Sequence, residues 1–225
     1  MTQSDTHMPA TRELPGSDGE HDLQERYGTA GRARSFYRRQ VLDRLNDRMA
    51  AFIDRQEMCF VATADARGEC DCSFRAGPPG FVRVLDERTL AYPEYRGNGV
   101  MASLGNLREN AHVGLLFVDF FRDVIGLHVN GTARVAELEE LAVAHPGLLA
   151  WAAAATNGNG SRPRPERWVW VHVQEAYIHC AKHIPRMAKV PREIAWGTDD
   201  VKRKGGDFFA ASCELRPWSE PTPEA

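Results

Sequence analysis

Apolar residues recur at spacings of mainly three and four between Phe36 and Ile53. This spacing places an apolar stripe along one side of a helix, which the pattern predicts over residues 35–55. The preceding residues, 1–32, are rich in Ser, Thr, Asp, Glu and Gly and have too few apolar side chains to offset the entropy of ordering them. We therefore expect a disordered N-terminal arm over residues 1–32, followed by a helix that covers one end of a sheet.

Short apolar runs separated by turn residues dominate the rest of the chain, and they predict strands. A turn at residues 65–68 predicts a hairpin between the first two runs. The Gly-Pro-Pro-Gly segment at 77–80 must interrupt a strand ladder, because proline has no amide hydrogen. Asn130-Gly131 breaks a later run. The predicted strands are at residues 58–63, 70–75, 81–85, 89–92, 113–118, 124–135 and 168–180.

Six or seven short strands and two or three helices indicate a mainly β, α+β fold. Further helices are predicted near residues 100–108 and 138–155. Numerous short strands favour a closed or nearly closed barrel, because closure removes the exposed edges of an open sheet. We expect one barrel domain at residues 33–190 and a partly ordered C-terminal extension at residues 191–225.

Composition limits the class of protein and its partners. A chain of 225 residues with 43% apolar content can bury one good core. The net charge of −3 provides no basic field for a nucleic acid or an acidic membrane, so we expect neither partner. No apolar run approaches the roughly 18–20 residues of a membrane span, and no signal-peptide pattern is present, so we expect a cytoplasmic protein. Five cysteines, an odd number, favour reduced thiols over disulfides.

Three arginines are candidates for binding a phosphate group. Arg75, Arg83 and Arg96 surround one predicted junction between a loop and a helix. Guanidinium groups bind phosphate well through paired donors, and the amide groups at a helix start favour anions. Ion pairs at the surface or at the barrel end are the alternative role of each arginine. Ser103 is either a hydroxyl ligand or an ordinary helix residue.

Cysteine and histidine residues offer a weaker candidate site. Cys70 and Cys72 share one strand face, and His179 and Cys180 lie together near the end of the last strand. The cysteine spacing is too short for the usual paired-thiolate zinc site, so no metal is expected. His128 could bind a cofactor ring or deliver a proton, but the pattern favours a structural histidine.

Several motifs occur in the order found in one known family. They are Cys-Ser-Phe-Arg at 72–75, Gly-Pro-Pro-Gly-Phe-Val-Arg at 77–83, Tyr-Pro at 92–93, Arg-Gly-Asn at 96–98, Asn-Ala-His-Val-Gly-Leu-Leu-Phe at 110–117, Val-Asn-Gly at 129–131 and Glu-Ala-Tyr-Ile-His-Cys-Ala-Lys at 175–182. With these motifs, residues 35–190 resemble the pyridoxamine 5′-phosphate oxidase-like FMN-binding split-barrel family, in its uncharacterised FMN-binding branch. The resemblance implies a split β-barrel that forms a homodimer, with an FMN in each of two clefts at the subunit interface.

The resemblance also implies which residues bind the cofactor. True pyridoxamine phosphate oxidases have two adjacent basic residues in the phosphate loop, whereas here only Arg96 is basic, and their terminal substrate motif is not evident. The resemblance therefore implies the flavin and leaves the vitamin substrate aside. The implied cofactor-binding residues are Ser73, Arg75, Arg83, Tyr92, Pro93, Arg96, Asn98, Ser103, His128 and Lys182.

The function implied by the resemblance is an FMN-dependent oxidoreductase acting on an unknown small molecule. A hydride or an electron pair would pass between the flavin and a substrate over the exposed ring face, while the protein sets orientation and electrostatics. No side chain stands out as a catalytic nucleophile. Two alternatives remain open on the same fold: a deazaflavin-dependent reductase, and a haem- or flavin-binding protein that catalyses nothing.

Overall fold

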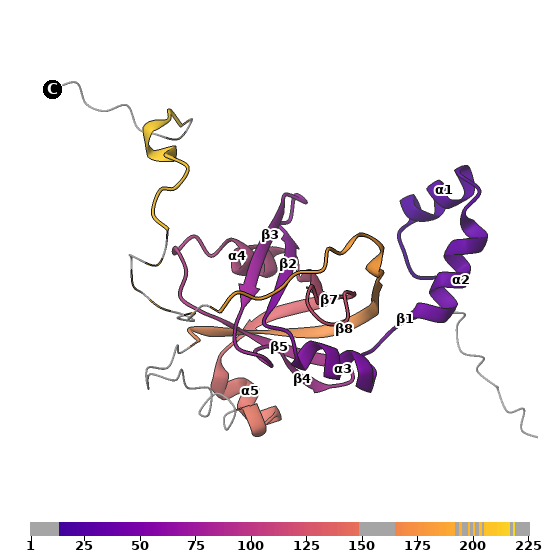
Figure 1. Cartoon of the computed structure of the whole chain (residues 1–225), viewed down its shortest axis with the longest axis horizontal. Coiled ribbons are helices and arrows are strands. Elements are labelled where there is room, and N and C mark those ends of the chain that lie inside the picture. The colour runs from indigo at the N-terminus through magenta and orange to yellow at the C-terminus, as the bar shows by residue number, and fades with distance from the viewer. Residues whose placement is uncertain are drawn as a thin grey trace, which may run out of the picture.

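An antiparallel sheet of eight strands forms the main body of the molecule (Figure 1). The computed structural model describes residues 14–148, 165–191 and 205–216, together with residues 194, 198, 200, 203 and 218. The strands are β1 (Val41–Leu42), β2 (Met58–Ala64), β3 (Cys70–Ala76), β4 (Arg83–Asp86), β5 (Thr89–Glu94), β6 (His112–Val118), β7 (Gly126–Ala136) and β8 (Arg167–His179).

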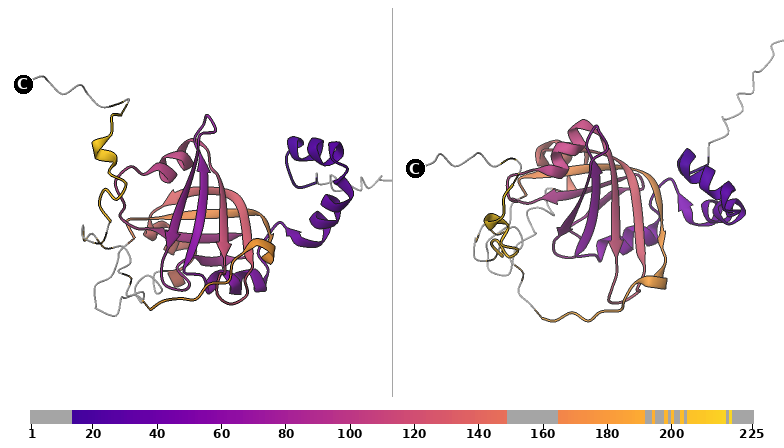
Figure 2. Two further views of the ribbon diagram at one scale, coloured as in Figure 1. Left: turned by 45° about the horizontal axis from the view of Figure 1, so that its top comes forward. Right: turned by 90° about the horizontal axis from the view of Figure 1, so that it is seen from above.

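The sheet curls into a barrel that is open along one seam. Its strand order is β3-β2-β6-β7-β8-β5-β4, and β1 pairs with the second half of β8. Within the described residues, the two outermost strands of this order, β3 and β4, do not pair with each other. Figure 2 shows the resulting curved wall of strands. The prediction of a mainly β split barrel is therefore confirmed, with seven longer strands and the two-residue β1.

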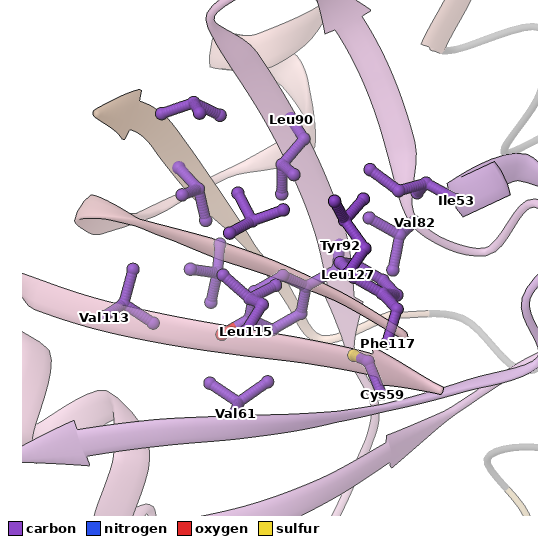
Figure 3. Packing of buried hydrophobic residues seen from close by; sticks show 14 of the residues in the cluster. Ile53, Cys59, Val61, Val82, Leu90, Tyr92, Val113, Leu115, Phe117 and Leu127 are labelled. Carbon is purple, nitrogen blue, oxygen red and sulfur yellow. The ribbon is translucent and has the colours of Figure 1, made fainter. Parts of the chain in front are cut away.

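Alternate side chains of the strands fill the barrel interior. Val61 of β2, Leu115 of β6 and Val129 of β7 are almost completely buried, and Figure 3 shows Val61 and Leu115 pointing toward the same core. Burying an aliphatic side chain of this kind stabilises a fold by about 1.5–3 kcal/mol. Tyr92 of β5 lies in this core too, because the alternation along β5 directs it inward.

The pairing of β7 with β8 contains a bulge between Asn130 and Gly131, which confirms the predicted interruption. A Cβ atom at Gly131 would lie 2.0 Å from the carbonyl oxygen of His172. Only glycine permits this close approach of two strands.

The predicted single helix over residues 35–55 is wrong. The structure instead has α2 (Ala30–Gln40), β1 and α3 (Asp47–Asp54). The chain leaves the helix because β1 pairs with Tyr177 and Ala176 of β8. A new helix then starts where the Asn46 side chain accepts a hydrogen bond from the Met49 amide, at 2.9 Å.

Part of the segment for which a disordered arm was predicted is helical in the structure. Helix α1 (Asp18–Arg26) begins at Ser17, whose hydroxyl accepts a hydrogen bond from the Glu20 amide at 3.2 Å, and α2 begins at Ala30. Helix α1 buries none of its residues. Figures 1 and 2 show α1 and α2 extending to one side of the barrel. Residues 1–13 lie outside the described residues.

The remaining helices are short. Helix α4 (Ala102–Glu109) confirms the prediction near residues 100–108, and α5 (Leu138–Ala144) confirms the start of the helix predicted at 138–155, whose residues 149–155 lie outside the described part. Two 3-10 turns follow at Ala181–His183 and Ala211–Cys213. None of the helices in the described residues has the length and apolar character that crossing a bilayer requires.

Candidate functional site

Strand β3 presents three polar side chains on the face that it turns toward the barrel. Asp71, Ser73 and Arg75 share this face because side chains alternate along a strand, and all three are partly covered. In the pairing with β2, Ser73 lies opposite Val61 and Arg75 opposite Cys59, two residues of the core. Since β3 is the first strand of the open seam, these polar groups lie at the edge of the apolar interior.

An ion pair joins the two sides of the seam. The Arg75 Nε atom donates to the Glu94 Oε1 atom at 2.7 Å, and only 20% and 12% of the two side chains are exposed. Arg75 belongs to β3, whereas Glu94 ends β5, which lies second from the other edge of the sheet. Burial raises the pKa of the Glu94 carboxyl group, and the charge of Arg75 opposes that shift.

Two hydroxyl groups connect this ion pair to Asp71. The Arg75 Nη2 atom donates to the Ser103 Oγ atom at 3.3 Å, and the Ser73 and Ser103 Oγ atoms lie 2.9 Å apart. Both hydroxyl groups donate to the Asp71 Oδ2 atom, at 2.7 Å from Ser73 and 3.1 Å from Ser103. The result is a connected polar cluster, defined here as Asp71, Ser73, Arg75, Glu94 and Ser103.

Helix α4 brings Ser103 to this cluster. Ser103 is buried in the first turn of the helix, and Leu107 packs into the barrel core one turn later. The Asn106 Nδ2 atom donates to the Thr63 Oγ1 atom of β2 at 3.1 Å. These contacts hold the beginning of α4 against the end of the barrel.

The loop before α4 exposes the amide end of the helix. Gly99 has φ +86°, a left-handed conformation that favours glycine, and Met101 has φ +56° at the N-cap position. Met101 makes no side-chain capping hydrogen bond to the first turn of α4. The Asn98 side chain instead accepts a hydrogen bond from the Val100 amide at 3.0 Å, within the loop. Such a helix start attracts negative charge.

A pocket of about 850 Å³ lies over this loop and the polar cluster. Its charged lining is balanced, since it consists of three arginines and three carboxylates: Arg75, Arg96, Arg167, Asp71, Glu94 and Glu166.

The structure brings half of the predicted binding residues to this one pocket. They come from β3, from the loop after β5 and from α4, and they are Ser73, Arg75, Arg96, Asn98 and Ser103.

Other predicted residues lie outside the lining of this pocket. Arg83 forms an ion pair with Asp54 of α3, at 3.3 Å. Tyr92 points into the core, where its hydroxyl group has no hydrogen-bond partner among the described residues and burial raises its pKa well above 10. Pro93 is buried in β5, and Lys182 is exposed in the 3-10 turn Ala181–His183.

His128 belongs to a separate aromatic group on the outer side of β7 and β8. Its Nε2 atom lies 3.0 Å from the His179 Nδ1 atom, and its ring stacks on Tyr177 with 4.8 Å between the centroids. Burial, helped by repulsion from His179, lowers the pKa of His128. These contacts favour the structural role considered for this histidine. The described residues contain no group of three or more metal-binding side chains.

A larger hollow of about 1050 Å³ separates the Leu14–Glu20 segment from β1, β2 and β6. Among the described residues, its lining includes the acidic residues Asp43 and Glu175 but no arginine or lysine. A phosphate group would find no cationic partner in that lining, so the smaller pocket is the better candidate site.

Sequence reasoning missed four charged members of the pocket: Asp71, Glu94, Glu166 and Arg167. Asp71 could have been found, because it precedes Ser73 by two residues on a strand and therefore shares its face. Glu94 and Arg167 could not, because the register of β5 and β8 and the curl of the sheet bring them to the pocket.

Comparisons with known proteins agree with this fold. Residues 45–180 match the model of the family called pyridoxamine 5′-phosphate oxidase. Among solved structures, the chain is 22% identical to HupZ of Group A Streptococcus, which it matches over 64% of its own length and 99% of that chain, with a TM-score of 0.45. No curated protein matches the chain.

Two more distant structures also resemble the chain. A Clostridium acetobutylicum protein related to general stress protein 26 is 12% identical, with coverage of 59% and 86% and a TM-score of 0.39. HutZ of Vibrio cholerae, a heme storage protein, is 12% identical, with coverage of 60% and 95% and a TM-score of 0.37. Similarities at this level do not identify a cofactor.

Proposed function

We propose that this chain, which belongs to the pyridoxamine 5′-phosphate oxidase family, is an FMN-binding flavoprotein. We further propose that it is an FMN-dependent oxidoreductase acting on a small molecule. The observation that carries the proposal is the pocket in which Arg75, Arg96 and the hydroxyl groups of Ser73 and Ser103 surround the start of α4.

These residues fit the phosphate end of the cofactor. Arg96 and Arg75 provide guanidinium donors, the two serines provide hydroxyl donors, and the first turn of α4 provides amide groups. A volume of about 850 Å³ lies within the usual size of cofactor sites. When bound, FMN would supply the two-electron chemistry of its ring.

The chain's own part in the proposed reaction is to bind and orient. Glu94 holds Arg75 in place through the Nε atom, while the Nη1 atom donates to the Phe74 carbonyl oxygen and the Nη2 atom to the Ser103 hydroxyl oxygen, so the guanidinium group is positioned in the pocket lining before a ligand binds. Ser103 is fixed by the packing of α4, and the loop at 96–101 borders the pocket on the solvent side.

We also propose that the protein is a cytoplasmic homodimer whose cofactor clefts lie at the subunit interface. Phe74 supports an interface on the outer side of β2 and β3. It is 55% exposed in the middle of β3, and its ring meets that of Phe60 edge to face at 5.7 Å. An exposed aromatic side chain beside a second, half-buried one is typical of surfaces that another protein covers.

The test of the proposed cofactor is a titration of the purified apoprotein with FMN. Arg96→Ala should weaken binding by about 1.5–3 kcal/mol, because one charge-assisted hydrogen bond to the phosphate is lost. Flavin fluorescence gives the dissociation constant.

Arg67→Ala is the matched control for this titration. Arg67 lies in the hairpin between β2 and β3, its side chain is 74% exposed, and it is absent from the pocket lining. The control should bind FMN like the unmodified protein. Equal affinity of the Arg96→Ala variant, or an equal loss in both variants, would contradict the proposed site.

A further inference from the structure

The hydroxyl groups proposed to bind phosphate already have an anionic partner in the chain itself. Ser73 and Ser103 belong to different elements, β3 and α4, yet both donate to the same oxygen of Asp71. The carboxylate therefore lies where an oxygen of a bound phosphate group would accept the same two hydrogen bonds.

The hydrogen atoms of this cluster are too few to serve a second anion at the same time. The Ser73 and Ser103 hydroxyl groups carry one proton each, whereas their oxygen atoms and the Asp71 Oδ2 atom form three close contacts, at 2.7, 2.9 and 3.1 Å. A charged acceptor attracts both protons, so the contact between the two serines is left without one. A phosphate group could gain these donors only if Asp71 released them.

The other donor of the cluster is partly occupied as well. Arg75 directs its Nε atom to Glu94, and its Nη2 atom to the Ser103 hydroxyl oxygen. Asp71 itself forms no ion pair within the described residues, and its side-chain partners there are the two neutral hydroxyl groups. Its negative charge is therefore not neutralised by a direct cationic contact, and it repels an incoming anion.

We propose that Asp71 sets the anion affinity of the pocket by competing with the phosphate group of the ligand for the hydroxyl groups of Ser73 and Ser103. The inference rests on the proposed function, since it assumes a ligand that carries a phosphate monoester. Asp71 is an affinity-setting residue in this account: it weakens binding of phosphate and favours release of the ligand.

The test compares Asp71→Asn with the unmodified protein, using FMN and inorganic phosphate as separate probes in calorimetric titrations. Asparagine keeps an acceptor oxygen for the serines but removes the negative charge, so the fold should be retained. The variant should bind both probes about tenfold more tightly. The gain should shrink at high salt, because it is electrostatic.

Glu69→Gln is the matched control, since it removes the same charge two residues along the chain. Glu69 pairs with Arg67 at 2.9 Å, is 72% exposed and does not line the pocket. This variant should bind both probes like the unmodified protein. Adding Ser103→Ala to Asp71→Asn should remove part of the gain, because one of the two donors for which Asp71 competes is then missing.

The outcomes separate the inference from the proposed cofactor. Tighter phosphate binding by Asp71→Asn without any FMN binding would support the role of Asp71 and contradict the flavin. FMN binding that is unchanged or weaker in a folded Asp71→Asn variant would overturn the inference and leave the flavin standing. An equal gain in Glu69→Gln would also overturn it, and binding of neither probe by any variant would overturn both.

Discussion

Glu94 is the residue whose burial has the clearest energetic consequence. It is buried at the end of β5 and its contact with Arg75 does not offset the loss of water, so its pKa lies above the ordinary value of 4.5. The folded protein therefore holds this proton more tightly than the unfolded chain. The stabilising contribution is complete below the unfolded pKa and is lost as the pH rises through the folded pKa.

The Glu94→Gln variant tests this sign. Glutamine cannot ionise, so the free energy of unfolding of the unmodified protein should fall relative to that of the variant as the pH rises from about 4 to about 8. Urea denaturation of both proteins across this range measures the difference. A constant difference, or one that moves the other way, would show that Arg75 fully compensates the charge.

At the scale of elements, β3 and α4 build the candidate site, whereas α1 contributes little to the barrel. The period of two along β3 and the packing of Leu107 and Asn106 position the polar cluster. Helix α1 buries no residue and lies to one side of the barrel (Figure 1).

Deletion of residues 1–28 should therefore leave the barrel folded, with α2 still beginning after Thr29. We expect the melting temperature to change by no more than about 3 °C, because few apolar contacts are removed. Light scattering should give a dimer mass for both the full chain and the shortened one. A monomeric shortened chain would show that the removed segment holds the partner, and a monomeric full chain would contradict the proposed homodimer.

Local patterns predicted most of the strands but not the break between α2 and α3. Apolar spacing continues from Phe36 through Ile53, although β1 divides the helix by pairing with β8, more than 130 residues further along. No local pattern contains that pairing. Asn46 was the missed local signal, since asparagine before Asp47 is a common helix start.

The candidate site shows the same division between local and long-range information. Ser73 and Arg75 could be placed together from strand alternation, and Arg96 and Asn98 from their position in one loop. The same alternation places Tyr92 in the core. Its position beside a proline at the end of a strand had obscured this placement. The partner of Arg75 depends on how far the barrel curls, a property of the whole sheet.

At the scale of the whole molecule, a split barrel provides an open seam, and the charged pocket lies there. The apolar interior is filled by side chains such as Leu115 and Phe117 (Figure 3), so the proposed cofactor is expected in this pocket and not inside the barrel. The balanced charge of the pocket makes the identity of that cofactor the central question.

The most direct measurement is to purify the protein with its bound chromophore, release the chromophore by heat and determine its mass after chromatography. The account predicts FMN, at about one molecule per chain, and its loss from the Arg96→Ala variant but not from Arg67→Ala. Release of a deazaflavin or a haem, or FMN that the Arg96→Ala variant retains in full, would contradict the account.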